Sequence, residues 1–436
     1  MQAQRKFRLA YVVSHPIQYQ APLLRRLAQE PDIELKVFFC ADYSAKGYED
    51  EGFGGIHVKW DVPLLEGYEY EFLPALRRST KASFAAPINR GFCQAFKKEK
   101  FDAIWLHGYW NVNSMVAMAA AKLLGIPVME RAEGTLIDHP RSRFRLEMKR
   151  AYFAIMRHFI AAVLPISSRN REYWEHYLGA EFPSFMVPYA VDNAYFQKTA
   201  AMASDSREEF RAQLGLERDR QVILYASKLM ERKRCIDLIE AYIGMKPGAN
   251  GKKPYLLIVG DGSERARCEA RVLESAETGV RFLGFQNQSK LAQYFDLGDV
   301  FVLPSVHEPF GLIVNEVMNA GKAIVVSDEV GSQPDLITDG VNGAVFRAGD
   351  ILALRAALED ILENTEMRRE MGFRSLLRIN QWSFEEDVRG LRAALHHVAG
   401  LPLSTPKPNA AATGGESAKA VTRGQSASAL EPATSP

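Results

Sequence analysis

The amino-acid sequence predicts an α/β protein in which two doubly wound parallel sheets follow one another along the chain. Two observations predict this class. Short apolar runs alternate with longer helical patterns before about residue 200, and the same alternation starts again near residue 221. The chain is also 436 residues long, which at roughly 150 residues per domain argues for two large domains or three small ones. Ligands of such sheets bind outside the carboxyl ends of the strands, so the cleft between the sheets is the expected site.

The first unit contains short apolar runs that we predict to be strands, with helical patterns between several of them. The predicted strands are Arg8–Ser14, Glu34–Phe39, Glu69–Leu73, Ala103–Leu106, Val128–Arg131, Ala162–Ile166 and Phe185–Val187. The predicted helices are Ala21–Gln29 after the first strand, Val112–Leu124 after the fourth and Phe144–Phe159 before the sixth. This alternation is typical of a parallel sheet with helices on both faces.

The second unit repeats the pattern with strands rich in β-branched and aromatic residues. Its predicted strands are Val222–Ala226, Tyr255–Val259, Val280–Leu283, Val300–Leu303 and Ala323–Val326. Its predicted helices are Cys235–Tyr242, Glu264–Ala276, Leu291–Leu297 and Gly311–Ala320. The connection between the two units, residues 192–220, is more polar.

These elements divide the chain into four segments. Residues 1–197 are predicted to form the first Rossmann-like domain and residues 198–382 the second. Residues 383–401 are predicted to form a C-terminal helix that can pack back on the first domain. Residues 402–436 are rich in Ala, Ser, Thr, Pro and Gly and contain no aromatic residue, so we predict a disordered tail.

The composition excludes several classes of protein. Lys and Arg number 54 and Asp and Glu number 53, and this net charge of +1 argues against a protein that coats nucleic acid. The four cysteines are far apart, which argues against a disulfide framework or a zinc ribbon and fits a reducing compartment. Charged residues interrupt the most apolar stretches before they reach the roughly 20 residues of a membrane helix. The apolar run near the N-terminus is interpreted as a strand rather than a signal peptide, so we expect a cytoplasmic protein.

The densest chemical signal lies between Asp299 and Phe346. A predicted buried strand is followed there by a loop with Glu308 and by a helix expected to start at about Phe310–Gly311. The backbone N–H groups at a helix start can hold a phosphate, which Glu308 and Glu316 would then bracket. A single Glu is most often solvated, but two carboxylates around an anion site suit a nucleotide sugar, which has phosphate in the middle and hydroxyls at both ends.

A second basic element follows the first strand of the second unit directly. Its sequence is Tyr225-Ala-Ser-Lys-Leu-Met-Glu-Arg-Lys-Arg234. Lys228 and Lys233 can converge on a diphosphate as point charges, whereas Arg232 is expected to be solvated or paired locally. Such a charge cluster is usually a solvated loop, but its position at the carboxyl end of a strand favours a ligand site.

Together these segments resemble the retaining GT-B glycosyltransferases of family four. The Glu-x7-Glu element of that family corresponds to Glu308-Pro-Phe-Gly-Leu-Ile-Val-Asn-Glu316. Other similar segments are Gly331-Ser-Gln-Pro-Asp335, Asp339-Gly-Val-Asn-Gly343, Ile258-Val-Gly-Asp-Gly262 and Arg281-Phe-Leu-Gly284. The likeness covers about residues 220–385 and is looser in the first half, at Ser167 and Pro188-Tyr-Ala-Val-Asp192.

The resemblance implies two Rossmann-like domains facing across a cleft and a transfer of sugar, with retention, from a nucleoside diphosphate sugar to a hydroxyl acceptor. Lys228 and Lys233 would stabilise charge on the leaving diphosphate. Glu316 would hold the ribose hydroxyls, and Glu308 with the backbone at the helix start would hold the donor sugar. The expected catalytic residues are Lys233, Lys228, Glu308 and Glu133, and the expected donor-binding residues are Glu316, Phe310, Gly311, Ser227 and Gly260.

The chain departs from the family pattern at three places. Ser227-Lys228 stands where the family usually has Gly-Arg, which keeps the charge but loses the guanidinium fork. The segment Ser14-His-Pro-Ile-Gln-Tyr-Gln-Ala-Pro22 replaces the glycine-rich loop after the first strand. Glu133 stands where the family has a histidine near the scissile centre, which implies a different contact with the sugar.

His15, His107 and Arg131 follow or end strands of the first domain and are candidates on the acceptor side, although a packed or surface histidine is an equally good explanation for either His. The acceptor is expected to be a glycan or a lipid-linked sugar in cell-surface glycan or glycolipid biosynthesis. Residues 141–159 are basic and amphipathic, with an apolar stripe formed by Phe144, Met148, Tyr152, Ile155 and Phe159. The favoured interpretation packs this stripe on the sheet, and the other places it on an anionic membrane at its inner face.

No Asp-x-Asp motif is present, and the resemblance implies neither a bound metal nor a cofactor besides the donor substrate. Two alternative functions stay open. One is a non-catalytic nucleotide-sugar-binding scaffold, which the replacement at Glu133 supports and the presence of Lys233, Glu308 and Glu316 opposes. The other is a GT-B-like sugar-nucleotide epimerase, which the phosphate loop that follows Ser227-Lys228 disfavours.

Overall fold

The computed structural model describes residues 6–81, 83–137, 142–248 and 251–402 of the chain. The described residues up to Leu401 form one compact unit. The predicted disordered tail, residues 402–436, lies outside the described residues apart from Pro402.

The first sheet has six parallel strands in the order β10-β9-β8-β1-β2-β5. They are β1 (Phe7–Val13), β2 (Ile33–Phe39), β5 (Glu69–Phe72), β8 (Ala103–His107), β9 (Val128–Arg131) and β10 (Ala162–Val163). The central strand β1 is almost entirely apolar and buried, as a strand covered on both faces must be.

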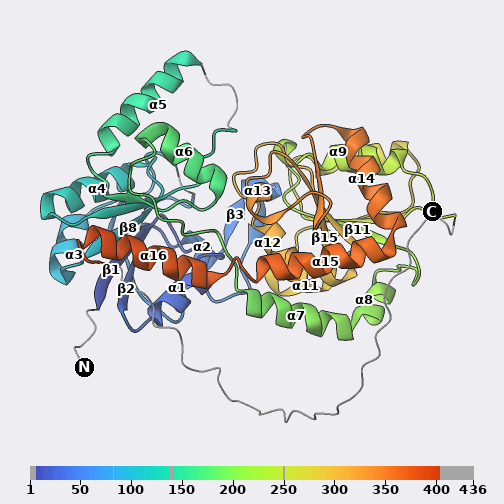
Figure 1. Cartoon of the computed structure of the whole chain (residues 1–436), viewed down its shortest axis with the longest axis horizontal. Helices are drawn as coiled ribbons and strands as arrows, with labels where there is room; N and C mark the ends of the chain where they lie inside the picture. Colours follow the sequence, from blue (N-terminus) through green and yellow to red (C-terminus); the bar gives the residue numbers. More distant parts are fainter. Residues whose placement is uncertain (1–5, 82, 138–141, 249–250, 403–436) are drawn as a thin grey trace, which may run out of the picture. The chain divides into compact units, whose positions relative to one another are not determined.

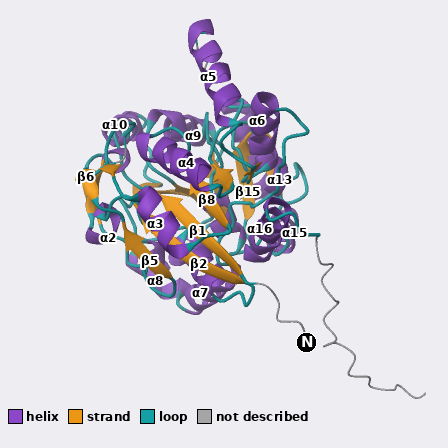
Figure 2. Ribbon diagram, turned by 90° about the vertical axis from the view of Figure 1, so that its left-hand side faces the viewer, coloured by secondary structure: helices purple, strands orange, loops and turns teal. Residues whose placement is uncertain are grey.

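Helices cover both faces of this sheet. One face packs against α1 (Ala21–Ala28) and α16 (Phe384–Val398). The other packs against α3 (Phe92–Glu99), α4 (Val112–Leu124), α5 (Arg143–Met156) and α6 (Ser168–Leu178), with α3 and α4 in front of the strands in Figure 2. Helix α16 comes from the end of the described chain and lies beside the first sheet (Figure 1). Its Val388, Leu391 and Leu395 lie in the same core as β1.

Short elements connect the strands of the first sheet. Helix α2 (Tyr43–Lys46) precedes an antiparallel ribbon of β3 (Tyr48–Asp50) and β4 (Ile56–Val58), and a second ribbon pairs β6 (Ala75–Arg77) with β7 (Ile88–Asn89). The β3–β4 ribbon turns through a 3-10 helix whose first N–H groups are capped by Asp50, which accepts a hydrogen bond from the Gly52 N–H at 2.8 Å.

The second sheet also has six parallel strands, in the order β13-β12-β11-β14-β15-β16. They are β11 (Val222–Ala226), β12 (Tyr255–Val259), β13 (Val280–Phe282), β14 (Val300–Leu303), β15 (Ala323–Ser327) and β16 (Gly343–Phe346). One face packs against α7 (Asn193–Asp205), α8 (Arg207–Gln213), α11 (Gln288–Leu297), α12 (Ile313–Met318) and α13 (Gln333–Leu336). The other packs against α9 (Cys235–Gly244), α10 (Arg265–Glu274) and α14 (Ile351–Glu363), and α15 (Thr365–Ile379) contributes to both cores.

The two parallel sheets confirm the predicted fold class, and most predicted strands match the observed ones to within one residue at each end. The strand predicted at Phe185–Val187 is wrong. Its N–H groups do bond to the edge of the first sheet, from Phe185 to Val163 at 3.0 Å and from Val187 to Pro165 at 2.9 Å. Prolines at 165, 183 and 188 lack the N–H groups that a regular ladder needs, so no strand forms.

Two further predictions differ from the structure in the second half. The polar connection at 192–220 contains helices α7 and α8. The helix expected to start at Phe310–Gly311 starts at Ile313, because Gly311 has a φ of 88° and a left-handed residue cannot belong to a right-handed helix. Glu316 therefore lies in the first turn of α12.

Helix α5 projects beyond the other helices of the first sheet (Figures 1 and 2). Phe144, Met148 and Ile155 on this helix are 73%, 58% and 63% exposed, so the favoured packing of the apolar stripe on the sheet is wrong for these three residues. Phe153 and Met156 are the buried residues of α5. Within the described ranges, no helix combines the length and the apolar character needed to cross a bilayer.

Candidate active site

A cavity of about 500 Å³ lies at the carboxyl ends of β11 and β14, and we call it the donor cavity. The predicted residues that line it are Ser227, Lys228, Lys233, Gly260, Glu308, Gly311 and Glu316. Residues of the first half also line it, among them Gln18, Tyr19, Phe53 and Trp60. The structure thus brings most of the predicted catalytic and donor-binding residues to one place at the strand ends.

Lys233 and Glu308 form a buried ion pair in the wall of the donor cavity, and each residue is 8% exposed. The loops that carry them are joined by a backbone hydrogen bond of 2.8 Å from the Val306 N–H to the Arg232 carbonyl. Arg232 Nη1 also lies 3.3 Å from the Glu308 carboxylate. Burial lowers the pKa of Lys233, and the charge of Glu308 opposes that shift. A diphosphate entering the cavity would meet these basic groups already held in place.

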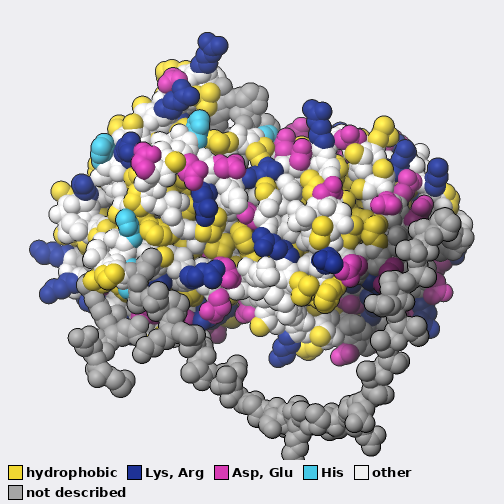
Figure 3. All heavy atoms as spheres, in the orientation of Figure 1, with side chains coloured by type: hydrophobic (Ala, Val, Ile, Leu, Met, Phe, Trp, Pro, Cys, Tyr) yellow, Lys and Arg dark blue, Asp and Glu magenta, His cyan; other side chains and the backbone are white. Residues whose placement is uncertain are grey.

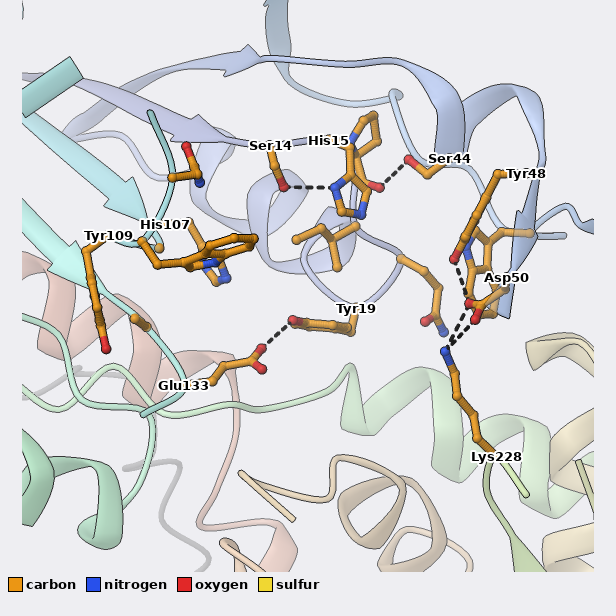
Figure 4. Close-up of a pocket in the computed structure, with 18 of the residues that line it drawn as sticks. Ser14, His15, Tyr19, Ser44, Tyr48, Asp50, His107, Tyr109, Glu133 and Lys228 are labelled. Atoms are coloured by element: carbon orange, nitrogen blue, oxygen red, sulfur yellow. Dashed lines mark hydrogen bonds and ion pairs between the residues drawn. The ribbon is translucent and has the colours of Figure 1, made fainter. Parts of the chain in front are cut away.

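Lys228 is held by a residue that sequence reasoning missed. Its Nζ lies 2.9 and 3.0 Å from the two carboxylate oxygens of Asp50, at the end of β3. The same Nζ lies 4.6 Å from the centre of the Phe53 ring, in a cation–π contact. Figure 4 shows the Asp50 carboxylate between Tyr48 and Lys228. The lysine that was predicted to bind a diphosphate is therefore already paired with an acidic side chain.

Two glycines of the donor cavity are required by the backbone around them. Gly260 has a φ of 132°, and a Cβ atom there would lie 2.0 Å from the carbonyl oxygen of Ser227. Gly311, with its left-handed φ of 88°, would place a Cβ atom 3.1 Å from Leu303 and Val330. Both positions let loops from neighbouring strands approach each other closely.

The side chain of Glu316 lines the donor cavity, whereas that of Phe310 does not. Glu316 is 7% exposed, it lines the donor cavity, and its Oε2 has no hydrogen-bond partner. Burial raises the pKa of Glu316 to about 8, so the carboxyl group is mostly protonated at neutral pH. The Phe310 side chain is 3% exposed and packs edge-on against Tyr189, with ring centres 5.5 Å apart, and it is not among the residues that line the cavity. Any contact of Phe310 with a donor sugar must therefore come from its backbone.

A second cavity, of about 590 Å³, lies at the carboxyl ends of β1, β8 and β9, and we call it the acceptor-side cavity (Figure 4). The predicted residues His15, His107 and Glu133 all line it. It shares Gln18, Tyr19, Phe53, Trp60 and Lys228 with the donor cavity, so the two cavities adjoin.

The predicted residues of the acceptor-side cavity are held by other polar groups. His15 Nδ1 lies 2.8 Å from the Ser14 hydroxyl and 2.7 Å from the Tyr43 hydroxyl. The Glu133 carboxylate accepts hydrogen bonds from Tyr19 at 2.9 Å and Tyr189 at 2.6 Å. Burial lowers the pKa of His15 to about 4.

His107 also stays neutral. Burial is the largest cause that lowers the pKa of His107 to about 3, and the Arg131 charge adds to it. Its Nε2 lies 3.4 Å from the Tyr189 hydroxyl. Both histidines of this cavity are therefore uncharged at neutral pH.

The prediction that Arg131 faces the acceptor is wrong. Its side chain is 1% exposed and donates hydrogen bonds to the carbonyls of Val187 at 2.9 Å and Pro188 at 2.7 Å. It also lies 3.3 Å from the Asp387 carboxylate on α16. Arg131 therefore joins the first sheet to the C-terminal helix and is not among the residues that line the acceptor-side cavity.

Sequence reasoning also missed most of the aromatic lining. The aromatic residues of the acceptor-side cavity are Tyr19, Tyr48, Phe53, Trp60, Tyr109 and Trp110. Two signals in the sequence could have pointed to them. Tyr109 and Trp110 follow a predicted strand almost directly, at the edge where ligands bind. The glycine-rich stretch Gly52-Phe-Gly-Gly55, next to Asp50, marks a tight loop.

Among the described residues, no group of three or more His, Cys, Asp and Glu side chains is arranged to hold a metal ion.

Comparison with known proteins shows which family part of the chain matches. Residues 206–375 match the family described as glycosyl transferases group 1. The chain is 27% identical over 257 residues to the α-D-kanosaminyltransferase of Streptomyces kanamyceticus, a match that covers 58% of this chain and 65% of that protein. It is 26% identical over 378 residues to the D-inositol 3-phosphate glycosyltransferase of Streptomyces avermitilis, covering 81% of this chain and 76% of that protein.

A solved structure extends the likeness to the fold. HepE of Anabaena, in complex with UDP and glucose, superposes with a TM-score of 0.67 at 18% identity, covering 89% of this chain and 99% of that one. The strand order of both sheets and the position of the cavities at the strand ends agree with the GT-B architecture. Residues 206–375 of this chain thus match the glycosyl transferases group 1 family, of the family-four type, and the chain has the GT-B fold.

Proposed function

We propose that the protein transfers a sugar from a nucleoside diphosphate sugar to a hydroxyl group of an acceptor. The observation that carries this proposal is the charge pattern of the donor cavity. Three basic side chains, Lys228, Arg232 and Lys233, line it. They face the Glu308 carboxylate and the Glu316 carboxyl, which is mostly neutral at pH 7. The excess of basic groups suits a diphosphate, whose negative charge increases as the sugar leaves.

Three roles in the transfer fall to these residues. The bond between the anomeric carbon and the diphosphate oxygen breaks, a bond from that carbon to the acceptor oxygen forms, and the proton of the acceptor hydroxyl passes to the leaving diphosphate. Lys228 and Lys233 take up the charge on the leaving diphosphate. Glu316, with an unpartnered oxygen in the cavity, is placed to bond ribose hydroxyls. Glu308 holds Lys233, and the resemblance implies that it also contacts the donor sugar.

Retention of configuration and independence of metal ions are part of the same proposal. Both follow from membership of the family rather than from a contact in the site. The known complex of HepE with UDP supports a nucleoside diphosphate as the leaving group for a protein of this fold.

A binding screen tests the donor part of the proposal. UDP-, GDP- and ADP-sugars are added singly, and thermal unfolding is followed. A ligand at 100 times its Kd stabilises the folded protein by about 2.7 kcal/mol, which is measurable as a higher Tm. We expect one nucleotide class to raise the Tm of the wild type, and a smaller effect for Lys233→Ala. The exposed Lys290→Ala, which removes the same charge away from the cavity, serves as the control.

Analysis of the products in the same mixtures separates the alternatives. A scaffold would be stabilised by the donor but would release no nucleoside diphosphate from it. An epimerase would change the sugar and keep it attached to the nucleotide. A chain that none of the donors stabilises would contradict the proposal.

We further propose that the protein acts in the cytoplasm and contacts the inner face of an anionic membrane through α5, in the synthesis of a cell-surface glycan or glycolipid. The four cysteines are free, which supports a reducing compartment. The exposed Phe144, Met148 and Ile155 lie on a helix that also carries basic residues, and Figure 3 shows basic and hydrophobic side chains together at its projecting end. Such a surface suits an anionic bilayer.

A further inference from the structure

The acceptor-side cavity carries little positive charge that could bind an anion. Among the described residues that line it, Lys228 is the one with a charged basic side chain, and its Nζ is already paired with Asp50. His15 and His107 are neutral at pH 7. Arg131, the other cation at the strand ends, is directed away into its contacts with Val187, Pro188 and α16. A phosphate or carboxylate on the acceptor would find no unpaired cation among these residues.

The acceptor-side cavity carries negative charge, which disfavours an anionic acceptor. Glu133 and Asp50 both line it. If a diphosphate takes over Lys228 in the adjoining donor cavity, Asp50 loses its partner and the acceptor-side cavity becomes more negative. Carboxylates accept hydrogen bonds from hydroxyl groups and repel anions, so this pair selects against a negatively charged acceptor as well as for a polyhydroxylic one.

Aromatic side chains supply the apolar part of the cavity. Trp110 is 48% exposed at its edge, and Trp60 and Phe53 lie where the two cavities adjoin. The C–H face of a sugar ring is apolar and slightly positive, and it packs on the negative face of an aromatic ring. Tyr19, whose hydroxyl already donates to Glu133, is also present in both cavities.

We infer that the acceptor is an uncharged saccharide, whose ring packs on Trp110 and whose hydroxyls bond to Glu133 and Asp50. The inference rests on the proposed glycosyl transfer, since it concerns the second substrate of that site. It separates this chain from transferases whose acceptor is a sugar phosphate. The first 200 residues do carry 26 basic and 21 acidic residues, but the excess lies outside the cavity.

The test measures acceptor binding directly, without requiring turnover. Saturation-transfer NMR is recorded on the full chain, saturated with the nucleoside diphosphate (UDP, GDP or ADP) that the thermal screen selects, with neutral methyl glucosides, methyl galactosides, maltose and lactose, and with glucose 6-phosphate, galactose 6-phosphate and glucuronate. We expect a neutral sugar to bind at least about tenfold more tightly than its phosphate or carboxylate counterpart, a difference of about 1.4 kcal/mol. Tighter or equal binding of the charged counterpart overturns the inference, as does the absence of binding by every neutral sugar.

Two variants locate the binding. Trp110→Ala is expected to weaken binding of the neutral sugar by about tenfold, because an aromatic platform contributes about 1 kcal/mol beyond the area that it buries. Phe373→Ala removes an aromatic side chain that is 56% exposed on α15, outside the cavity, and should change nothing. Equal binding by Trp110→Ala and the wild type overturns the assigned position. Release of UDP from a donor is measured separately, so that a failure of the proposed transfer is distinguishable from a failure of this inference.

Discussion

Replacing Asp50 with Asn is expected to tighten the binding of a nucleoside diphosphate. In the structure Lys228 is paired with Asp50, so a diphosphate has to displace a carboxylate before it can use this lysine. Asn removes the charge and keeps the shape of the side chain. The remaining amide oxygen can still accept the hydrogen bond from the Gly52 N–H that holds the β3–β4 turn.

The size of the effect follows from the exposure of the pair. The Lys228 side chain is 33% exposed and that of Asp50 is 11% exposed. Exposed ion pairs contribute about 0.2–1 kcal/mol, and partial burial places this one near the upper limit. A free-energy difference of about 1 kcal/mol corresponds to about a fivefold lower Kd. The loss of repulsion between Asp50 and the diphosphate acts in the same direction.

The assay is a calorimetric titration of UDP, GDP and ADP into wild type and Asp50→Asn. Glu51→Gln is the matched control, since Glu51 is the adjacent residue, is 79% exposed and pairs with Lys81 rather than with a residue of the phosphate loop. The gain from Asp50→Asn should shrink as salt is added, because salt screens the pair and the repulsion alike.

An unchanged or higher Kd in Asp50→Asn would refute this reasoning. It would mean that Lys228 keeps Asp50 when the nucleotide is bound, or that the nucleotide does not use Lys228 at all. A gain of the same size in Glu51→Gln would show that the effect comes from net charge and not from the pair.

Three further predictions concern stability, metal and membrane. Burial raises the pKa of Glu316 from 4.5 to about 8, so the folded state holds this proton more strongly, and the stability it contributes is full below pH 4.5 and falls as the pH rises to about 8. Urea unfolding at both ends of this range should show that the free energy of unfolding of the wild type falls by on the order of 4 kcal/mol, a loss that Glu316→Gln lacks. An equal change of the free energy of unfolding with pH in both proteins would contradict the buried carboxyl. Transfer activity should be the same with and without EDTA, and a loss restored by added Mg²⁺ would exclude the metal-independent proposal. Phe144→Ser should reduce co-sedimentation with vesicles containing anionic lipid, whereas equal sedimentation would exclude α5 as the contact.

The sheets of this fold were predictable because their strands are buried on both faces. Strands such as Val222–Ala226 and Val300–Leu303 appear in the sequence as continuous apolar runs, and the structure places them at the same residues. The β3–β4 and β6–β7 ribbons were not predicted, because strands of two or three residues are too short to show a periodicity. The predicted start of α12 was wrong because Gly311 is left-handed, so the helix begins only after it.

The donor cavity was largely predictable, and the acceptor side was not. Lys228, Lys233, Glu308 and Glu316 lie on loops at the ends of adjacent strands, so spacing and topology place them together. Asp50 is 178 residues away from Lys228 in sequence, and nothing local indicates that pair.

The direction of the Arg131 side chain could not be predicted from the sequence either. The residue ends a strand as predicted, but side-chain direction there depends on the contacts available in the folded chain. The carbonyls of Val187 and Pro188 and the carboxylate of Asp387, which follows it by 256 residues, take its guanidinium away from the cavity.

The most direct test of the central claim is the release of nucleoside diphosphate from a panel of UDP-, GDP- and ADP-sugars, measured for the wild type and Lys233→Ala. Loss of one preorganised cation beside the leaving group typically lowers the rate by about 100-fold to 1,000-fold. Glu308 keeps Arg232 as a partner in this variant, so the fold should remain intact, which circular dichroism checks. We predict that one donor class is turned over by the wild type and that Lys233→Ala is slower by about that factor. Release from none of the donors, or an equal rate in the folded variant, would contradict the claim.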